Sequence, residues 1–462
     1  MEPISIDEAL AVTAGELVAG DGRAGICSIT TDTRGLSRGD FFIPLKGKRF
    51  DGHDYLDVAL DGGCSGAVCS RLLTDADIRK WSSSGAVLIR VDDTLRALQQ
   101  IAKRYRERFQ IPLVAITGSN GKTTTKDMVA AIAAGSFSVL GSEGTFNNDV
   151  GVPLTLLRLE RHHSLAVLEL GMNSRGEIAR LAGIAAPTIG VITNVGPAHL
   201  EFLGTVEEVA TSKAELLEAM VMHNGGVAVL NCDDPYVSHM GKRLNLKVKT
   251  FGMGPGADVR AESVHAAWGE VKFLLSFKGN SRPLAVAVPV VGVHNVYNAL
   301  AAAAVCEELG MEPGEIAERL RDVRLPPMRM ETSVIRGITV INDAYNANPA
   351  STRAALEAFK GVAAGGKKIL VMGDMLELGA SAERAHREIG HSVVECGLDL
   401  LIAVGELGAF AAEGAKQAGM SDAGVVTCAD AREAASVLQE RASEGDCVLL
   451  KASRRVGLER VL

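Results

Sequence analysis

The sequence predicts an α/β protein with three domains, and three observations lead to this fold class. A length of 462 residues corresponds to about three domains of ordinary size. Apolar segments that fit strands alternate with helical segments in two long blocks, which is typical of mostly parallel sheets. A glycine-rich turn opens the first of these blocks, and a pair of prolines separates it from the second. We therefore expect domains at residues 1–108, 109–324 and 325–462.

The N-terminal block, residues 1–108, alternates short strands with helical pieces and ends in a charged helical segment at residues 94–109. It contains the run T-D-T-R at residues 31–34. Surface loops often contain such a run, so on its own it is a weak signal for a binding site.

Residues 113–126, LVAITGSNGKTTTK, are the most informative stretch of the chain. An apolar strand ends at Thr117, two glycines follow, and a helix is expected over residues 126–134. Backbone N–H groups of such a turn can close on phosphate oxygens, and a helix N-terminus favours an anion. Lys122 would neutralise the β- and γ-phosphates of a nucleotide, and the hydroxyl of Thr123 would reach Mg²⁺.

The stretch departs from the standard phosphate-loop pattern at one position. Ile116 stands where that pattern has its first glycine, which leaves the shorter motif G-x-x-G-K-T. A glycine-rich turn without a ligand is therefore an alternative. The strand before the turn and the helix after it favour nucleotide binding.

After this loop, apolar strands at residues 164–170, 188–195 and 226–231 are interleaved with helices and predict a mostly parallel sheet. Between residues 258 and 290 the pattern changes to strands of antiparallel type. The segment VRLPPMRM at residues 323–330 marks the next boundary, because consecutive prolines cannot continue a helix. Strands and helices alternate again beyond it.

Two candidate metal ligands follow strands, at the edge where open α/β sheets bind ligands. Glu169 lies near the end of strand 164–170, and a carboxylate close to a phosphate loop suits Mg²⁺. A solvated glutamate at a strand end is the alternative. His199 lies just beyond strand 188–195 in a tight loop. Because imidazole is not the usual ligand of Mg²⁺, the residues alone favour a structural loop histidine.

Lys213 interrupts the apolar face of a predicted helix that begins with a capping box at Thr205 and Glu208. A lysine on a buried face is costly unless it is paired or chemically altered. A packed stem with an exposed ammonium, or a salt bridge, explains it without chemistry, and the residues alone favour these two explanations. The third explanation is a neutral amine that captures CO₂ to become a carbamate, an anion able to bind a metal.

Two asparagine-containing segments are weaker candidates. The loop TFNNDVGVP at residues 145–153 supplies Asn147 and Asn148, although asparagine is also common in turns. At the start of a later helix, Asn298 could hydrogen-bond a purine, whereas Asn295 is expected to cap the helix.

Composition excludes several classes of protein. A formal charge of -8 and few aromatic residues argue against nucleic acid as a partner. No segment approaches the roughly 18–20 apolar residues of a membrane helix, and the N-terminal residues do not resemble a signal peptide. The eight cysteines lack paired spacing and are expected to be free thiols. We therefore expect a cytoplasmic monomer without membrane insertion.

The chain resembles a known family over essentially its whole length, through motifs that occur in order. They are TGSNGKTTTK, TFNNDVGVP, ELGMNSRGEI, NVGPAHLEFLG, SKAE, GVHNVYNALAA, INDAYNANPAS, VMGDMLELG and LLKASR. Together they resemble the ATP-dependent Mur ligases of peptidoglycan synthesis. The segment at residues 30–55 is similar to a UDP-sugar domain of that family. Ala452 is one departure, because the family usually carries glycine there.

The resemblance implies an N-terminal UDP-binding domain, a central P-loop ATPase-like domain and a C-terminal Rossmann-like domain. It implies catalytic roles for Lys122, Glu169, His199 and Lys213, with Thr123, Glu169, His199 and a carbamylated Lys213 around two Mg²⁺ ions. The ATP site would comprise Thr117, Gly118, Ser119, Asn120, Gly121, Lys122, Thr123, Thr124, Asn298, Arg329, Asp343, Tyr345 and Asn346. The substrates would meet Thr31, Asp32, Thr33, Arg34, Lys46, Asn147, Asn148, Asp374, Met375, Glu377, Leu378, Lys451, Ser453 and Arg454.

The activity implied by the resemblance is the ATP-dependent addition of D-alanyl-D-alanine to UDP-N-acetylmuramoyl-tripeptide (UDP-MurNAc-tripeptide) through an acyl phosphate, which yields the UDP-MurNAc-pentapeptide. Folylpolyglutamate synthase is an alternative, since it resembles the same central and C-terminal blocks. A sibling Mur ligase that adds a single amino acid is another. A nucleotide-binding switch that ligates nothing is a third, and it leaves Glu169, His199 and an inward Lys213 without a use.

Overall fold

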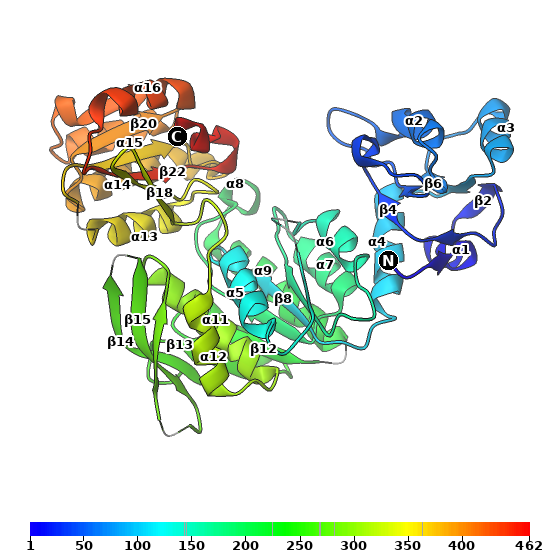
Figure 1. Cartoon of the computed structure of the whole chain (residues 1–462), viewed down its shortest axis with the longest axis horizontal. Coiled ribbons are helices and arrows are strands. Elements are labelled where there is room, and N and C mark those ends of the chain that lie inside the picture. Colours follow the sequence, from blue (N-terminus) through cyan, green and yellow to red (C-terminus); the bar gives the residue numbers. More distant parts are fainter. Residues whose placement is uncertain (143, 145, 224, 268, 281, 363) are drawn as a thin grey trace. The chain divides into compact units, whose positions relative to one another are not determined.

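The computed structural model describes residues 1–142, 144, 146–223, 225–267, 269–280, 282–362 and 364–462 (Figure 1). The chain forms two compact units. The first unit contains Met1–Ala115, Phe137–Gly171 and Glu177–Thr188. The second unit contains Ile116–Ser136, Met172–Gly176 and Ile189–Leu462.

The N-terminal part of the first unit is built on a five-stranded sheet. Its strands lie in the order β2 (Glu16–Ala19), β7 (Val87–Arg90), β6 (Gly66–Cys69), β5 (Phe41–Phe42) and β4 (Ile29–Thr30), and all neighbours except β2 and β7 are parallel. Strands β1 (Ile4–Ser5) and β3 (Gly25–Ile26) form a separate pair. The flanking helices are α1 (Ile6–Thr13), α2 (Leu56–Asp61) and α3 (Asp75–Ser84). Phe42, Leu88 and Trp81 pack together in the core of this part.

The charged helical segment predicted at residues 94–109 is helix α4 (Thr94–Arg106). The side chain of Asp93 caps its first turn by accepting from the N–H of Arg96. The hydroxyl of Tyr105 donates to the carbonyl of Leu159 at 2.6 Å, within the first unit. Helix α4 also contacts α6 (Gly151–Leu156) and α7 (Glu177–Ala185), so it ties the N-terminal sheet to the rest of this unit.

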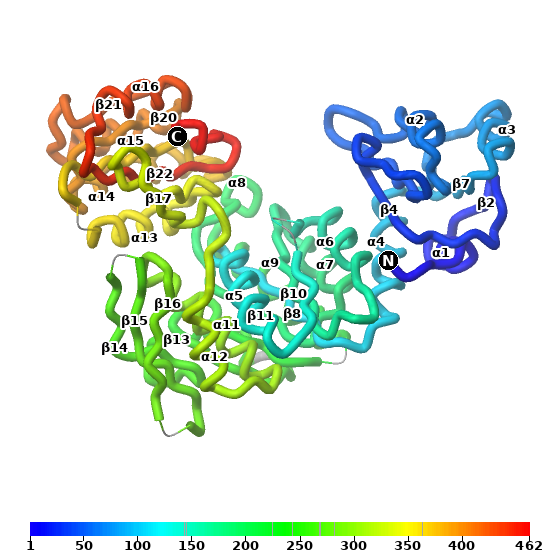
Figure 2. The backbone as a smooth tube through the Cα atoms, in the orientation of Figure 1, coloured from blue at the N-terminus to red at the C-terminus, as the bar shows by residue number. Residues whose placement is uncertain are grey.

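A nine-stranded sheet follows in the sequence. Its order is β16 (Leu284–Val288), β15 (Glu270–Phe277), β14 (Val259–Ala267), β13 (Lys247–Gly252), β12 (Val227–Asn231), β11 (Ile189–Ile192), β8 (Leu113–Thr117), β10 (Leu165–Glu169) and β9 (Val139–Gly141). The strand pairs β11–β12, β12–β13 and β13–β14 are parallel. Strands β14, β15 and β16 are antiparallel, as their sequences predict, and Figure 2 traces the long hairpin of β14 and β15.

Helices of the second unit cover its part of this sheet. They are α5 (Lys122–Ala133), α8 (Leu200–Leu203), α9 (Val206–Met222), α10 (Val237–Met240), α11 (His294–Glu308) and α12 (Pro313–Arg319). Helix α11 is lined with buried alanines and packs closely on α5. The prediction that a helix starts at residue 126 is wrong, because α5 begins at Lys122. Gly121 takes a left-handed conformation and lets the helix start directly after the turn.

The C-terminal part of the second unit contains a six-stranded sheet. Its order is β17 (Glu331–Ile335), β18 (Ile338–Asn342), β22 (Cys447–Lys451), β19 (Lys368–Gly373), β20 (Leu400–Val404) and β21 (Val425–Cys428). All neighbours are parallel except β17 and β18. The alternation along β19 sends Leu370 and Met372 into one core and Ile369 and Val371 into the other.

These two cores lie on opposite faces of the six-stranded sheet. One face packs against α13 (Pro349–Lys360), α14 (Ala382–Glu395) and α15 (Gly408–Gln417), and the other packs against α16 (Ala431–Arg441). Figure 1 shows α13 and α16 on opposite sides of the strands. The predicted α/β fold class with mostly parallel sheets is therefore confirmed.

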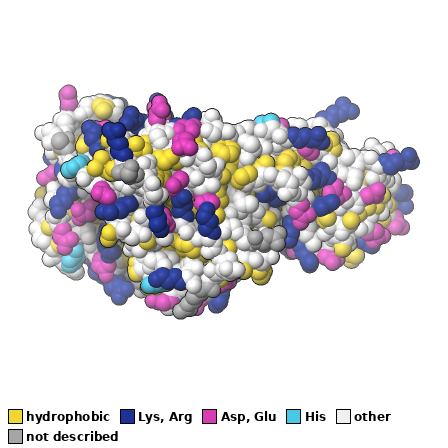
Figure 3. Space-filling view, turned by 90° about the horizontal axis from the view of Figure 1, so that it is seen from below, with side chains coloured by type: hydrophobic (Ala, Val, Ile, Leu, Met, Phe, Trp, Pro, Cys, Tyr) yellow, Lys and Arg dark blue, Asp and Glu magenta, His cyan; other side chains and the backbone are white. Residues whose placement is uncertain are grey.

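The surface agrees with the mixed charge of the sequence. Figure 3 shows lysine and arginine side chains interspersed with aspartate and glutamate over the face in view. Among the helices in the described part of the chain, none is both long and apolar enough to cross a membrane.

Candidate active site

The glycine-rich turn between β8 and α5 has no room for larger residues at two positions. Gly118 and Gly121 have positive φ angles of 151° and 81°. A Cβ atom on Gly118 would lie 1.8 Å from the hydroxyl of Thr193, and one on Gly121 would lie 2.1 Å from the amide oxygen of Asn298. The turn therefore depends on both glycines for its shape.

Side chains and backbone from the end of β11 hold this turn in place. The N–H of Asn120 donates to the side-chain oxygen of Asn194 at 2.9 Å, and the N–H of Ser119 donates to the backbone carbonyl of Asn194 at 2.9 Å. The hydroxyl of Thr193 donates to the carbonyl of Asn120 at 2.6 Å. Thr193 and Asn194 were not among the residues predicted from the sequence, although their place directly after a strand of the same sheet was a usable signal.

Lys122 lies in the first turn of α5. Its ammonium donates to the carbonyl of Gly118 at 2.8 Å and approaches that of Ser119 at 3.4 Å. The lysine thus lies over the turn whose N–H groups and helix N-terminus would attract phosphate. The next two residues, Thr123 and Thr124, are buried in the same helical turn. The hydroxyl of Thr117, at the end of β8, is buried without a hydrogen-bond partner among the described residues.

Thr123 is contacted by a residue from the start of the C-terminal block. The guanidinium of Arg329 donates to the Thr123 hydroxyl at 2.8 Å. Its central carbon also lies 4.2 Å from the centre of the Tyr345 ring, a cation–π contact. The structure therefore brings together three residues that the sequence assigned to the ATP site from segments far apart in the chain.

A buried ion pair lies next in the same wall of predicted ATP residues. The Lys451 ammonium is 2.5 Å from a carboxylate oxygen of Asp343 and donates to the carbonyl of Asn346 at 2.9 Å. The sequence predicted that Lys451 contacts the acceptor substrate or a phosphate group. In the structure its charge is neutralised by Asp343. The other carboxylate oxygen of Asp343 accepts from the N–H of Met330 at 3.2 Å.

Asn298 lies against the glycine-rich turn, as expected for a residue of the nucleotide site. Its amide oxygen accepts from the Thr125 hydroxyl at 3.3 Å, and its amide nitrogen donates to Asn295 at 2.9 Å. The prediction that Asn295 caps the helix is wrong. Helix α11 begins one residue earlier, and the Asn295 side chain donates to the carbonyl of Val291 at 2.9 Å.

His199 is paired with Glu377, which comes from the C-terminal block of the same unit. Their Nδ1 and Oε2 atoms are 2.8 Å apart. Both residues have positive φ angles, 57° and 64°, which is unusual for residues other than glycine. The hydrogen bond from His199 lowers the pKa of the Glu377 carboxyl, although burial acts in the opposite direction. The sequence predicted that Glu377 contacts the acceptor substrate, whereas in the structure its carboxylate is hydrogen-bonded to His199.

Lys213 is buried in the middle of α9, with only 1% of its surface exposed. Burial, with a smaller contribution from the charge of Lys122, lowers the pKa of the Lys213 amine well below its ordinary value. In the part of the chain that the structure describes, no ion pair involves this side chain. The structure therefore supports neither an exposed ammonium nor a salt bridge at Lys213 among the described residues. A buried amine with a lowered pKa is consistent with the third explanation, the carbamate.

Glu169 belongs to the first unit, where it ends β10 and is 2% exposed. One of its carboxylate oxygens accepts from the side-chain amide of Asn147 at 2.7 Å. The amide oxygen of Asn148 instead accepts from two backbone N–H groups at the start of α6. Thr145, the first residue of this predicted loop, lies outside the described residues.

The T-D-T-R run forms a single exposed turn of the first unit. The carboxylate of Asp32 accepts from the backbone N–H of Arg34 and pairs with its guanidinium at 2.6 Å. These hydrogen bonds lower the pKa of Asp32 to about 2. Thr31 and Thr33 lie in the same turn, and Lys46 lies elsewhere in this unit in a β-bridge with Asp51.

The remaining predicted substrate residues lie in two loops of the C-terminal block. Met375 and Leu378 are buried, and the carboxylate of Asp374 accepts from the first N–H of α15 at 2.9 Å. Ser453 accepts from the N–H of Leu376 at 2.9 Å. Arg454 is paired with Glu459 at 2.6 Å. These side chains therefore contact the protein itself.

Models of one family match three successive parts of the chain. The Mur ligase family catalytic domain matches residues 25–106, the Mur ligase middle domain matches residues 116–306, and the Mur ligase glutamate ligase domain matches residues 328–454. The chain is 37% identical over 438 residues to the UDP-N-acetylmuramoyl-tripeptide–D-alanyl-D-alanine ligase of Bacillus subtilis, and the match covers 95% of this chain and 92% of that protein. The chain belongs to the Mur ligase family.

Other members of the family are similar along most of their length. The ligase of the same description from Escherichia coli is 34% identical, with 88% of this chain and 87% of that protein covered. The crystal structure of MurF from Acinetobacter baumannii superposes with a TM-score of 0.89 at 30% identity, covering 100% of this chain and 98% of that one. MurF from Thermotoga maritima in complex with ADP gives a TM-score of 0.81 at 28% identity, covering 94% and 96%. The folylpolyglutamate synthase of Mycobacterium tuberculosis shares the fold alone, at 17% identity.

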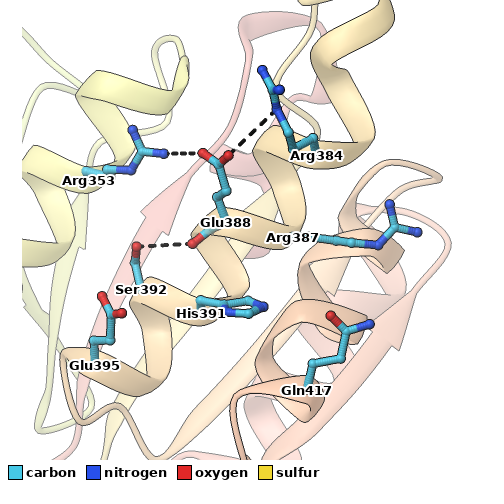
Figure 4. Close-up of a pocket in the computed structure, with 8 residues that line it drawn as sticks. All are labelled: Arg353, Arg384, Arg387, Glu388, His391, Ser392, Glu395 and Gln417. Atoms are coloured by element: carbon cyan, nitrogen blue, oxygen red, sulfur yellow. Dashed lines mark hydrogen bonds and ion pairs between the residues drawn. The ribbon is translucent and has the colours of Figure 1, made fainter.

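Among the described residues, no group of three or more His, Cys, Asp or Glu side chains is arranged to hold a metal ion. A separate cavity of about 500 Å³ lies on the surface of α13, α14 and α15 (Figure 4). Arg353 and Arg384 both pair with Glu388, and Arg387 pairs with Glu413. Its basic groups are thus neutralised locally, and none of its lining residues is among those predicted from the sequence.

Proposed function

We infer that this chain is an ATP-dependent ligase that adds D-alanyl-D-alanine to UDP-MurNAc-tripeptide and so forms the UDP-MurNAc-pentapeptide of peptidoglycan synthesis. One observation carries the inference. Relatives described as this ligase are 34–37% identical over most of their length and of this chain. The glycine-rich turn, with Lys122 lying over it, supports the use of ATP.

The nucleotide would be held by groups that lie together in the second unit. The N–H groups of the turn and the ammonium of Lys122 would bind the phosphates. Arg329, Tyr345 and Asp343 would surround the ribose and base, since they converge on the same wall as Thr123. Asn298 would contribute its amide once it releases Thr125 or Asn295.

The reaction would proceed in two steps. An oxygen of the terminal tripeptide carboxylate attacks the γ-phosphorus of ATP, and ADP leaves. The amine of D-alanyl-D-alanine then attacks the carbonyl carbon of the acyl phosphate and loses a proton to solvent. The amide bond forms, and inorganic phosphate leaves with the electron pair of the broken C–O bond. Lys122 would reduce the repulsion between the two anions in the first step, because it places a positive charge beside the transferred group.

The donor groups present suit two Mg²⁺ ions and a carbamate at Lys213. A carboxylate at Glu169 and a hydroxyl at Thr123 are the oxygen donors that Mg²⁺ prefers. The Thr123 hydroxyl already accepts from the cationic Arg329, so it is oriented to receive positive charge. A buried amine with a lowered pKa is the form that can capture CO₂, and the carbamate would give Lys213 the negative charge of a ligand. His199 would be the further ligand. Bound Mg²⁺ would neutralise phosphate charge.

The parts of the chain would divide the substrates between them. We propose that residues 109–324 hold ATP and that residues 325–462 receive the dipeptide. Residues 1–108 would hold the uridine diphosphate end of the other substrate. The residues that would contact it are Thr31, Asp32, Thr33, Arg34 and Lys46. We further propose that Asn147 and Asn148 of the first unit, and the loops at 374–378 and 451–454 of the second, contact the substrates. We propose that the enzyme works in the cytoplasm as a monomer and binds no nucleic acid.

The experiment that tests this function is phosphate release from ATP with a matrix of acceptors. We expect release with UDP-MurNAc-tripeptide only when D-alanyl-D-alanine is also present, and at least about 100-fold less with single amino acids, because an acceptor site with polar groups matched to a dipeptide discriminates strongly. Robust release with glutamate and a folate would assign the chain to folylpolyglutamate synthase. Release with a single amino acid would indicate a sibling Mur ligase, and release without any amine would indicate a nucleotide switch.

A further inference from the structure

The segment at residues 374–378, which carries Glu377, is held at three points by groups outside it. The carboxylate of Asp374 accepts from the first N–H of α15 at 2.9 Å. The N–H of Met375 donates to Nε2 of His386 at 2.9 Å, and the N–H of Leu376 donates to the hydroxyl of Ser453 at 2.9 Å. Two consecutive backbone donors are thus satisfied by side chains from separate elements.

His386 is fully buried on α14, and its hydrogen bonds fix the state of its ring. Its Nδ1 atom lies 2.7 Å from the carbonyl of Ala382, which can only accept, so Nδ1 carries the proton. Its Nε2 atom faces the N–H of Met375, which can only donate. The ring is therefore neutral, in one tautomer. Burial lowers the pKa of His386, which favours the same neutral form.

The held segment places Glu377 in an unfavourable backbone conformation. Its φ angle is 64°, in the left-handed region, and its carbonyl accepts from the N–H of Glu201 at 3.1 Å. Such a conformation persists only where the surrounding structure holds it. From this position the carboxylate reaches Nδ1 of His199 at 2.8 Å, which leaves Nε2 as the nitrogen of that ring outside the pair.

We propose that His386 is a positioning residue for the ligase reaction. Its Nε2 accepts a hydrogen bond from the N–H of Met375 and so fixes the segment at residues 374–378. That segment holds Glu377 against His199, and the contact orients the His199 ring. This inference rests on the proposed function for the role of His199. His386 acts through Glu377, and Ser453 supports the same segment at the next residue.

Hydrogen exchange tests the holding of the segment without any substrate. His386→Gln keeps an acceptor that reaches the position of Nε2, whereas His386→Leu has similar size and no acceptor. We expect the amide of Met375 to exchange about ten-fold faster in the leucine variant than in the wild type, and within about three-fold of wild type in the glutamine variant. Equal exchange in the wild type and the leucine variant would overturn the proposal.

A double-mutant cycle tests whether His386 acts through Glu377. His386→Leu should lower kcat about ten- to a hundred-fold while the KM for ATP stays within about two-fold. In a Glu377→Gln background the same substitution should change kcat less than about two-fold, since nothing is left to position. Equal losses in both backgrounds would overturn the proposal, because they would show a general effect on the fold.

The conservative variant separates positioning from folding. His386→Gln should retain kcat within about three-fold of wild type. A glutamine variant as slow as the leucine variant, with an unchanged melting temperature, would overturn the proposal. His386→Asn, which is too short to reach Met375, replaces the leucine variant if that one does not fold. Failure of the wild type in the acceptor matrix would refute the proposed function but would leave the exchange result standing.

Discussion

The glycine-rich turn at residues 117–122 of the second unit is called the phosphate loop below. It and the T-D-T-R turn of the first unit are both short connections with a candidate anion-binding role. The phosphate loop is held from outside by hydrogen bonds with Thr193 and Asn194. The turn at residues 31–34 is stabilised by its own residues, since Asp32 binds an arginine only two positions away. The phosphate loop is thus stabilised by residues distant in the sequence, whereas the T-D-T-R turn is stabilised by hydrogen bonds between its own residues.

This difference has a consequence for binding. Groups held by a surrounding network are already ordered before the ligand arrives, so binding costs them little conformational entropy. The Arg34 side chain is 90% exposed and is paired with Asp32, so a ligand at this turn would have to compete with that ion pair. We therefore expect substitutions in the phosphate loop to affect turnover and folding, and substitutions in the exposed turn to affect mainly the affinity for one substrate.

The largest effect is expected from Lys122→Ala. It should lower kcat for phosphate release at least about 100- to 1,000-fold, because it removes a fixed charge beside the transferred phosphate. Arg34→Ala is the matched control in the exposed turn, and it should raise the KM for the UDP substrate while the KM for ATP stays within about two-fold of wild type. Steady-state kinetics with melting curves measure both variants. Similar losses of kcat in both variants would contradict the expected difference between the two loops.

A second prediction concerns Lys213, the buried amine of the second unit. Lys213→Ala should lower kcat about 100-fold, since it removes the proposed carbamate. Formate or acetate should restore part of the activity, because a small carboxylate can supply the missing negative charge in the space that is left. Chloride at the same ionic strength serves as the control. Equal rates with chloride and with carboxylates would count against the carbamate.

The smallest effect compares Gly121 in the phosphate loop with Gly35, which directly follows the T-D-T-R turn. Gly121→Ala should lower the free energy of unfolding by about 2 kcal/mol, because Gly121 has a φ of 81° and its new Cβ would clash with Asn298. Gly35→Ala should change it by less than about 0.5 kcal/mol, since no atom lies within 4 Å of the added Cβ. Urea unfolding measures both. A Gly121→Ala variant as stable as Gly35→Ala would show that the phosphate loop is not held as the structure indicates.

The sequence predicted the fold class because apolar periodicity and the placement of glycine and proline follow directly from backbone geometry. It also pointed to Lys213 through the single gap in an apolar face, and the structure places that residue in the interior. Its assignments of substrate and ATP residues stay predictions, although the structure brings Thr123, Arg329 and Tyr345 together.

Other features could not be predicted because they depend on contacts between distant segments. The pairing of His199 with Glu377 joins residues 178 positions apart. The role of His386 depends on a backbone N–H, which no side-chain pattern reveals. Asn295 was misassigned because the start of a helix is decided within one or two residues, and α11 begins at His294.

The order of the six-stranded sheet also bears on how the protein is made. Strand β18, the second strand of the C-terminal block, lies between β17 and β22, and β22 comes last in the sequence among the six described strands of this sheet. Lys451 on β22 pairs with Asp343, which directly follows β18, so this contact spans 108 positions in the chain. During synthesis β18 therefore stays without one of its neighbours until β22, more than 100 residues later, has left the ribosome. Chain-length-resolved folding on the ribosome should thus be late and abrupt for this block, since long-range strand pairing must wait for its partner.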